Sequence, residues 1–202
     1  ANYSITVNSQ LQLNLNTAIR NGHVATNNSG QFAYLGGDTT NSRTSVVTFS
    51  ISGTTITAGS VTEVSTSDIG STYGRSAIIY DSTNSAWLAG YYYRSGSTAD
   101  WVYMRTITIS SNTATVGSSQ PLIQFSGNNT KGSVTFAVDS VGGIVGFYGN
   151  DANKNASKQI TITNTGSGAT GLTISTGSEI VLSNHSTSYA ASNYGFEVAS
   201  SG

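Results

Sequence analysis

The chain of 202 residues contains no cysteine, a single proline and only 8% charged residues. Without cysteine there is no disulfide framework, no thiol nucleophile and no cysteine-ligated metal site. Ordinary globular proteins carry about 25% charged residues, so this chain must stay soluble through Ser, Thr, Asn and Gly. Its formal net charge of −1 argues against binding to nucleic acid or to an anionic membrane surface, because both need a basic face.

Long apolar runs are also missing. None approaches the roughly 18 residues of a membrane-spanning helix. The segment from Ala1 to Thr6 is already strand-like and lacks the charged region and the apolar stretch of a signal peptide. We therefore expect no membrane insertion, and we expect the chain to begin at a processed or excised end.

The apolar residues that are present predict β-strands and almost no helix. They alternate with Ser and Thr, as in Thr106-Ile-Thr-Ile-Ser110 and Gln159-Ile-Thr-Ile-Thr163, and a period of two is typical of half-buried strands. Clusters of Gly, Asn, Ser and Asp separate these runs, at Ser52-Gly-Thr54, Ser111-Asn-Thr113 and Asn164-Thr-Gly-Ser-Gly168. Such clusters predict turns.

The chain repeats itself with a period of about fifty residues, which is typical of repeat-built folds. A segment rich in Gly and aromatic residues recurs at 29–37, 84–90 and 142–149, and each copy is followed by a polar loop and a β-branched run, at 46–51, 102–109 and 159–162. We therefore expect one domain over residues 1–202, with a partial unit at 1–22, repeats at 23–72, 73–130 and 131–186, and a partial unit at 187–202.

Each unit can be written as four strands, A to D. They are expected at 23–26, 32–35, 45–51 and 56–64, at 76–80, 86–92, 101–109 and 114–116 (continuing irregularly towards 123), and at 133–138, 144–148, 158–163 and 172–182. The favoured fold is an all-β, β-propeller-like array of four-stranded blades, although alternation alone fits a β-sandwich or jelly roll equally well. The half-units at the ends either complete a fourth blade or mark a stretch of a larger ring.

This pattern carries a resemblance to known repeats. The order Phe/Trp-x-x-Gly, polar loop, β-branched run, Gly/Asn turn and Ile-Thr-x-Gly resembles the propeller-type repeats of phage tail and virion fibres and of large bacterial surface proteins. The resemblance covers most of the chain and implies a structural or adhesive module, without naming a ligand. Gly36-Gly37 and Gly142-Gly143 are similar to kelch repeats, but the spaced Tyr and Trp of that family are missing.

Motifs for catalysis or metal binding are not found. The nucleophile elbow, the phosphate-binding loop and the His-Glu-x-x-His motif are absent. His23 and His185 occupy equivalent repeat positions, but no further ligands can be identified beside them, so we expect neither metal nor cofactor. Asp81 and Asp139 could pair as the acid and base of a glycosidase. Their shared repeat position, matched by Asn193, is better explained by turns in which the side chain accepts backbone amide hydrogen bonds.

Charged residues gather in the D–A and B–C connections, which would lie on one face of a propeller. They are Arg20, Asp68, Arg75 and Lys131 in or beside D–A connections, and Asp38, Arg43, Arg94, Asp100, Asp151 and Lys154 in B–C loops. Binding residues concentrate on loops that a rigid scaffold holds, although longer loops also hold more charge by their length alone. Exposed Tyr and Trp beside Arg and Asp are typical of sugar-binding sites, whereas packing between blades is favoured for any single ring.

The sequence therefore predicts a non-enzymatic structural or attachment module of a phage virion fibre or a cell-surface protein, located in the virion or outside the cell. The alternative is a polysaccharide-acting hydrolase domain. The predicted ligand-binding residues are Tyr92, Tyr93, Arg94, Asp100, Trp101, Arg43 and Lys154. Expected partners are a neutral or weakly charged surface glycan, a host receptor, and other copies or other surface proteins, with no nucleic acid among them.

Overall fold

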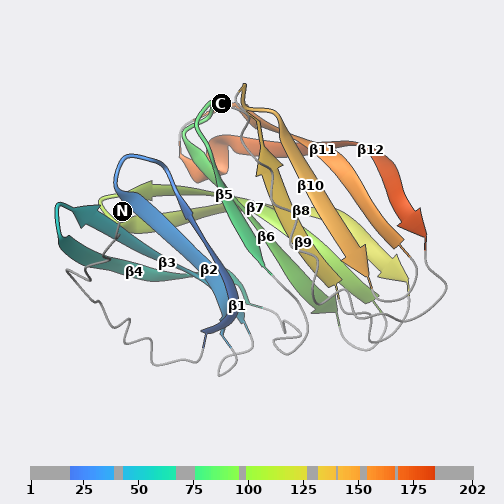
Figure 1. Cartoon of the computed structure of the whole chain (residues 1–202), viewed down its shortest axis with the longest axis horizontal. Coiled ribbons are helices and arrows are strands. Elements are labelled where there is room, and N and C mark those ends of the chain that lie inside the picture. Colours follow the sequence, from blue (N-terminus) through green and yellow to red (C-terminus); the bar gives the residue numbers. More distant parts are fainter. Residues whose placement is uncertain are drawn as a thin grey trace, which may run out of the picture.

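The computed structural model describes residues 19–38, 43–66, 76–95, 99–126, 132–139, 141–150, 154–166 and 168–184. These residues form an all-β structure of three four-stranded antiparallel sheets (Figure 1). The helical structure within the described ranges is the short 3₁₀ element η1 (Ala169–Gly171). No helix in this part of the chain is long and apolar enough to span a membrane.

Each sheet follows the chain order strand by strand. Sheet 1 contains β1 (Ile19–Thr26), β2 (Gln31–Asp38), β3 (Arg43–Ser52) and β4 (Thr55–Ser65). Sheet 2 contains β5 (Ala77–Asp81), β6 (Ala86–Ser95), β7 (Ala99–Ser110) and β8 (Thr113–Ser126). Sheet 3 contains β9 (Gly132–Val138), β10 (Ile144–Asn150), β11 (Lys154–Asn164) and β12 (Leu172–Asn184). Sequential strands thus pair as hairpins throughout.

All twelve strands expected within these ranges are present, and most run further than the sequence predicts. Strand β2 continues through Gly36 and Gly37, which pair with Ser45 and Thr44. Glycine has a low preference for strands, but hydrogen bonds to a neighbouring strand override that preference. Strand β8 likewise continues past Pro121, which lies on the edge strand of its sheet, where a missing amide donor is tolerated.

The sheets pack face to face in a row, with sheet 2 in the middle and sheets 1 and 3 on either side (Figure 1). One apolar cluster lies between sheets 1 and 2 and contains Leu35, Val46 and Trp87. A second lies between sheets 2 and 3 and contains Leu88 and Ile144. Because side chains alternate along a strand, β6 supplies neighbouring residues to opposite clusters.

This arrangement has three sheets rather than the two facing sheets of a sandwich. Corresponding strands of neighbouring sheets lie together, since β1 contacts β5 and β5 contacts β9 at one edge, while β4 contacts β8 at the other. Among the described residues the row is open, with β4 and β12 at its opposite ends (Figure 1). The expected partial unit 187–202, and the first eighteen residues of the unit 1–22, lie outside the described residues.

The turns between the first two strands of each sheet share one design. Asp81 Oδ1 accepts a hydrogen bond from the Thr83 amide at 2.9 Å, and Asp139 Oδ1 accepts one from the Val141 amide at 2.9 Å. The turn interpretation of the two aspartates is therefore confirmed. Asn27 does the same in sheet 1, where its Oδ1 accepts the Ser29 amide at 2.9 Å. The matching residue Asn193 lies outside the described residues.

Candidate functional site

An aromatic cluster covers the end of sheet 2 on the side that faces sheet 1. Strands β6 and β7 pair so that Tyr93 lies opposite Trp101 and Tyr91 lies opposite Tyr103. Directly opposed residues of an antiparallel pair project from the same face, so four rings share one surface. Ala89 pairs with Arg105 one step further along, which adds a guanidinium group to this surface.

Tyr103 is the centre of this cluster. Its ring lies 5.7 Å from that of Trp101 in a stacked arrangement and 5.2 Å from that of Tyr93 in an edge-to-face arrangement. A third stacked contact joins it to Tyr91 at 6.3 Å. Aromatic pairs with these spacings and angles are favourable, so the four rings hold one another in place.

A pocket of about 200 Å³ opens beside the rings, between sheet 2 and the end of β4. Its lining is Ser65, Thr66, Tyr91, Tyr93, Tyr103, Arg105 and Ser119. We call it the tyrosine–arginine pocket. The described residues of its lining combine aromatic faces, three Ser or Thr hydroxyl groups and one cation, with no carboxylate among them. Pockets that bind small ligands typically combine apolar rings with a few polar groups in this way.

Tyr91 and Arg105 form the polar floor of the pocket. Tyr91 is only 2% exposed, and burial raises the pKa of its phenol above the ordinary value, although Arg105 and Ser65 hydrogen-bond to it and act in the opposite direction. The phenol therefore stays neutral at physiological pH. The Nε of Arg105 is buried and has no hydrogen-bond partner, and a buried donor without a partner is costly. The burial of this nitrogen ties the guanidinium group to the wall of the pocket beside Tyr91.

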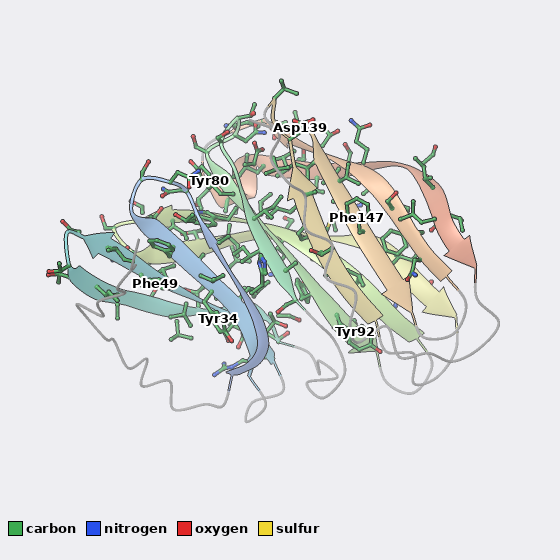
Figure 2. All side chains as sticks on the ribbon, viewed as in Figure 1. Tyr34, Phe49, Tyr80, Tyr92, Asp139 and Phe147 are labelled. Atoms are coloured by element: carbon green, nitrogen blue, oxygen red, sulfur yellow. The ribbon has the colours of Figure 1, made fainter. Side chains whose placement is uncertain are left out.

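Two of the predicted binding residues belong to this site. Tyr93 lines the pocket, and Trp101 stacks on the central ring of Tyr103. Tyr92 lies on the opposite side of the sheet, 5% exposed in the cluster between sheets 2 and 3. Figure 2 shows it near the lower edge of the row, away from Tyr80 and Asp139 at the upper edge. Its burial is that of a packing residue.

The remaining predicted residues are not brought to the pocket by what the structure describes. Arg43 forms an ion pair with Glu63 across β3 and β4, at 2.6 Å. Strand alternation places both on the face of sheet 1 that points away from sheet 2. Arg94 pairs with Asp100 in the β6–β7 ladder, and Lys154 begins β11. The side chains of these last three lie outside the described part of the structure.

Sequence reasoning missed Tyr91, Tyr103 and Arg105 as site residues. It grouped residues by their closeness to the β6–β7 loop, whereas the pocket follows one face of the two strands. The available signal was the alternation itself, since Tyr91 and Tyr93 are two residues apart, as are Trp101, Tyr103 and Arg105.

The other candidate groups have structural partners. His23 Nδ1 lies 2.9 Å from the carbonyl oxygen and 3.2 Å from the amide nitrogen of Ile78, so it links β1 to β5. His185 lies outside the described residues. Within the described ranges, no group of three or more His, Asp or Glu side chains could hold a metal ion.

Comparisons with known proteins found no similar protein. The chain matches no protein-family model, no curated protein and no solved structure.

Proposed function

We propose that this protein is a non-enzymatic attachment module of a virion fibre or a cell surface, and that it binds glycan through the tyrosine–arginine pocket. The observation that carries the proposal is an open pocket in which three tyrosine residues lie beside Arg105, with Trp101 stacked on one of them, Tyr103. Aromatic faces pack against the C–H face of a sugar ring, while hydroxyl and guanidinium groups meet its oxygen atoms.

The charge of the pocket indicates which glycans fit best. Among the described residues of the lining, Arg105 is the one that carries a charge. Arginine recognises carboxylate through a fork of N–H donors. A glycan with scattered carboxylate groups, such as one containing uronic acid, therefore fits better than a fully neutral one.

The two aspartates that could have served a hydrolase are engaged in turns. Asp81 is 1% exposed and also accepts a hydrogen bond from Asn84 Nδ2 at 2.7 Å. Asp139 also accepts the Gly143 amide at 2.7 Å. The part of the pocket lining that the structure describes contains no carboxylate, whereas most glycosidases use a pair of them. Both facts support binding without turnover.

The proposed module is a propeller-type array. Its support is the packing of three equivalent four-stranded sheets with corresponding strands aligned. In such an array each sheet is one blade, and the pocket lies between the first and second blades described. A site between blades is held by two rigid sheets, which suits a binding role.

The test is a binding titration with an oligosaccharide of galacturonic acid and with its neutral galactose counterpart. We expect the acidic oligosaccharide to bind more tightly, and we expect Arg105→Gln and Trp101→Ala each to weaken its binding at least tenfold. Release of reducing sugar on long incubation would instead support the hydrolase.

Arg43→Gln separates the pocket from the wider loop face, because Arg43 lies on the far side of sheet 1. Its binding should equal that of the parent protein. Equal losses in Arg43→Gln and Arg105→Gln would place the ligand elsewhere, and intact binding in Arg105→Gln would remove the pocket from the proposal. Thermal unfolding of each variant shows whether a loss of binding is simply a loss of fold.

A further inference from the structure

Each sheet contains the same irregularity at the same place. The ladder between its third and fourth strands skips at one residue, so that two residues of the fourth strand face one of the third, which is a β-bulge. The facing sets are Thr48 with Gly59-Ser60 in sheet 1, Thr106 with Gly117-Ser118 in sheet 2, and Gln159 with Gly177-Ser178 in sheet 3. A Gly-Ser pair therefore occupies the bulge in all three sheets.

In the first two sheets the bulge receives a backbone carbonyl from the next sheet. The carbonyl oxygen of Asn112, at the β7–β8 turn, accepts hydrogen bonds from Thr48 Oγ1 and, at 3.0 Å, from the Ser60 amide. The carbonyl oxygen of Ala169, between β11 and β12, accepts one from Thr106 Oγ1 at 3.1 Å. We call the bulge and its facing residue the carbonyl socket of each sheet.

Glycine is required in an occupied socket. A Cβ added at Gly59 would collide with the Asn112 carbonyl, and one at Gly117 would collide with the Ala169 carbonyl, both closer than 3.0 Å. At Gly177 the same test finds, among the described residues, contacts with Gln159 alone, whose Cβ is 3.5 Å away and whose carbonyl oxygen is 3.9 Å away. The socket of sheet 3 therefore has the same Gly-Ser bulge, with Gln159 in place of the facing Thr. No described residue of another sheet fills it, and Gln159 and Gly177 are exposed.

The complementary part is exposed at the other end of the row. In sheet 1 the β3–β4 turn is Gly53-Thr54, and its flanking pair Ser52–Thr55 corresponds to Ser110–Thr113 around Ser111-Asn112. Gly53 and Thr54 are both exposed. Thr54 thus stands where Asn112 stands in the hairpin that fills the first socket.

We propose that the open socket of sheet 3 receives the β3–β4 hairpin of a second copy of this chain, so that copies associate head to tail. A socket receives a hairpin turn once inside the molecule, where Asn112 enters sheet 1, and η1 supplies the carbonyl to sheet 2. The third socket and the β3–β4 turn are exposed at opposite ends of the row (Figure 1), so sheet 1 of the same copy does not reach this socket. The interface between two copies would repeat the packing between neighbouring sheets within one copy, and repeat arrays extend in this way.

Exposed apolar side chains near the socket support an interface there. On β12, Ile180, Val181 and Leu182 are 63%, 47% and 49% exposed. Val181 pairs with Ala156 of the cluster between sheets 2 and 3 and so lies on the face towards sheet 2. Ile180 lies on the opposite face, which carries the socket, and gives a second copy an apolar contact there. Head-to-tail contacts are heterologous, so they produce closed rings or filaments.

The experiment measures molar mass by sedimentation over about a hundredfold range of concentration, since association follows mass action. We expect the mass of the parent protein to rise with concentration. Gly177→Val should block the socket, and Thr54→Trp should block the hairpin, because the corresponding Asn112 side chain fits closely against Ser50 Oγ at 2.9 Å. In a solution of either variant alone, every copy has the same blocked end, so no complete interface can form. We expect its dissociation constant to rise at least tenfold and the variant to remain monomeric.

A mixture of the two variants gives the decisive result. Each variant retains one working half, so the mixture should form a one-to-one heterodimer and nothing larger. Thr115→Val on the exposed face of β8 is the matched control and should associate like the parent. A parent protein that remains monomeric, association that survives both variants, or Gly177→Val that unfolds as a monomer would overturn the proposal. The last result would indicate that the chain fills the socket itself. Glycan binding is measured separately and does not depend on this outcome.

Discussion

Thr106 Oγ1 donates a hydrogen bond to the carbonyl oxygen of Ala169, 3.1 Å away and 63 residues later in the chain. Thr106 is fully buried in sheet 2, and Ala169 belongs to the connection between the last two strands of sheet 3. This contact helps to set the depth at which sheet 3 docks on sheet 2, together with the hydrogen bonds from Lys158 Nζ to the Leu122 carbonyl at 2.9 Å and from Asn84 Nδ2 to the Ile162 carbonyl at 3.2 Å. The contact between Thr48 and Asn112 repeats it one sheet earlier.

The glycines of the sockets should differ sharply in their tolerance of alanine. Gly117→Ala places a methyl group against the Ala169 carbonyl, and overpacking of this kind costs about 1–3 kcal/mol. Gly59→Ala should behave likewise. Gly177→Ala should leave the free energy of unfolding of the monomer within about 0.5 kcal/mol of the parent. Urea unfolding of the three variants measures this, and equal losses at Gly117 and Gly177 would contradict an open third socket.

The turn aspartates should matter for stability in proportion to their burial. Asp81→Ala leaves the Thr83 amide and the Asn84 side chain without their acceptor in a buried turn. We expect a loss of about 1–3 kcal/mol. Asp139 is exposed, so water can replace its oxygen atoms and Asp139→Ala should cost less. Thermal unfolding compares the two, and a larger loss at Asp139 would contradict the assignment.

Alkaline pH should destabilise the protein through Tyr148. Burial, together with the hydrogen bond to Glu179 and the negative charge of that residue, raises the pKa of the Tyr148 phenol. The folded state therefore keeps a proton that the unfolded chain releases near its ordinary pKa of about 10. The stability that this proton contributes is present below pH 10 and is lost as the pH rises further.

Tyr148→Phe should make the decline of unfolding free energy above pH 10 less steep, and Tyr91, whose pKa is also raised, should account for part of what remains. Unfolding in urea at a series of pH values from 8 to about 11 gives the slope. The pocket variant Tyr91→Phe is the companion measurement. An unchanged slope in the Tyr148→Phe variant would show that the phenol ionises as readily in the folded state as in the unfolded chain.

Within the aromatic cluster, Tyr103→Ala should cost more stability than Trp101→Ala. Tyr103 contacts three rings, whereas the described contact of Trp101 is with Tyr103 alone. Each aromatic pair contributes about 0.5–1.5 kcal/mol beyond area burial, so the difference should reach about 1 kcal/mol or more. Thermal unfolding provides the comparison. If Trp101→Ala unfolds the protein, its ring is a packing residue rather than part of a binding surface.

The strands and turns were predictable because their determinants are local. Alternating Ile and Thr around residues 106–109 fixes β7, and Asp81 fixes its turn through an amide only two residues away. Strand ends were predicted too short wherever Gly or Asn continues a ladder, as at Gly36-Gly37 and Asn150. At those positions the hydrogen bonds to the neighbouring strand determine where the strand ends, and the local sequence does not show which strand is the neighbour.

The site was predicted only in part because a face depends on register. Tyr92 and Tyr93 are adjacent in sequence but lie on opposite sides of sheet 2. Arg105 reaches the pocket because Ser95 pairs with Ala99 at the end of the β6–β7 ladder. A shift of that pairing by one residue would turn Arg105 to the other face. The alternation of side chains along β6 and β7 therefore predicts the site residues better than closeness to the β6–β7 loop does.

The hairpin-only order of strands in each sheet has a consequence for how fast the chain folds. Partners within a sheet are near neighbours in sequence, whereas the links between sheets, such as that of His23 to Ile78, join residues 55 positions apart. Local contacts close small loops and form quickly, while distant ones form late. Folding can therefore begin in any one sheet and spread outward. During synthesis on a ribosome, the exposed apolar face of one sheet would be covered as soon as the following sheet has emerged.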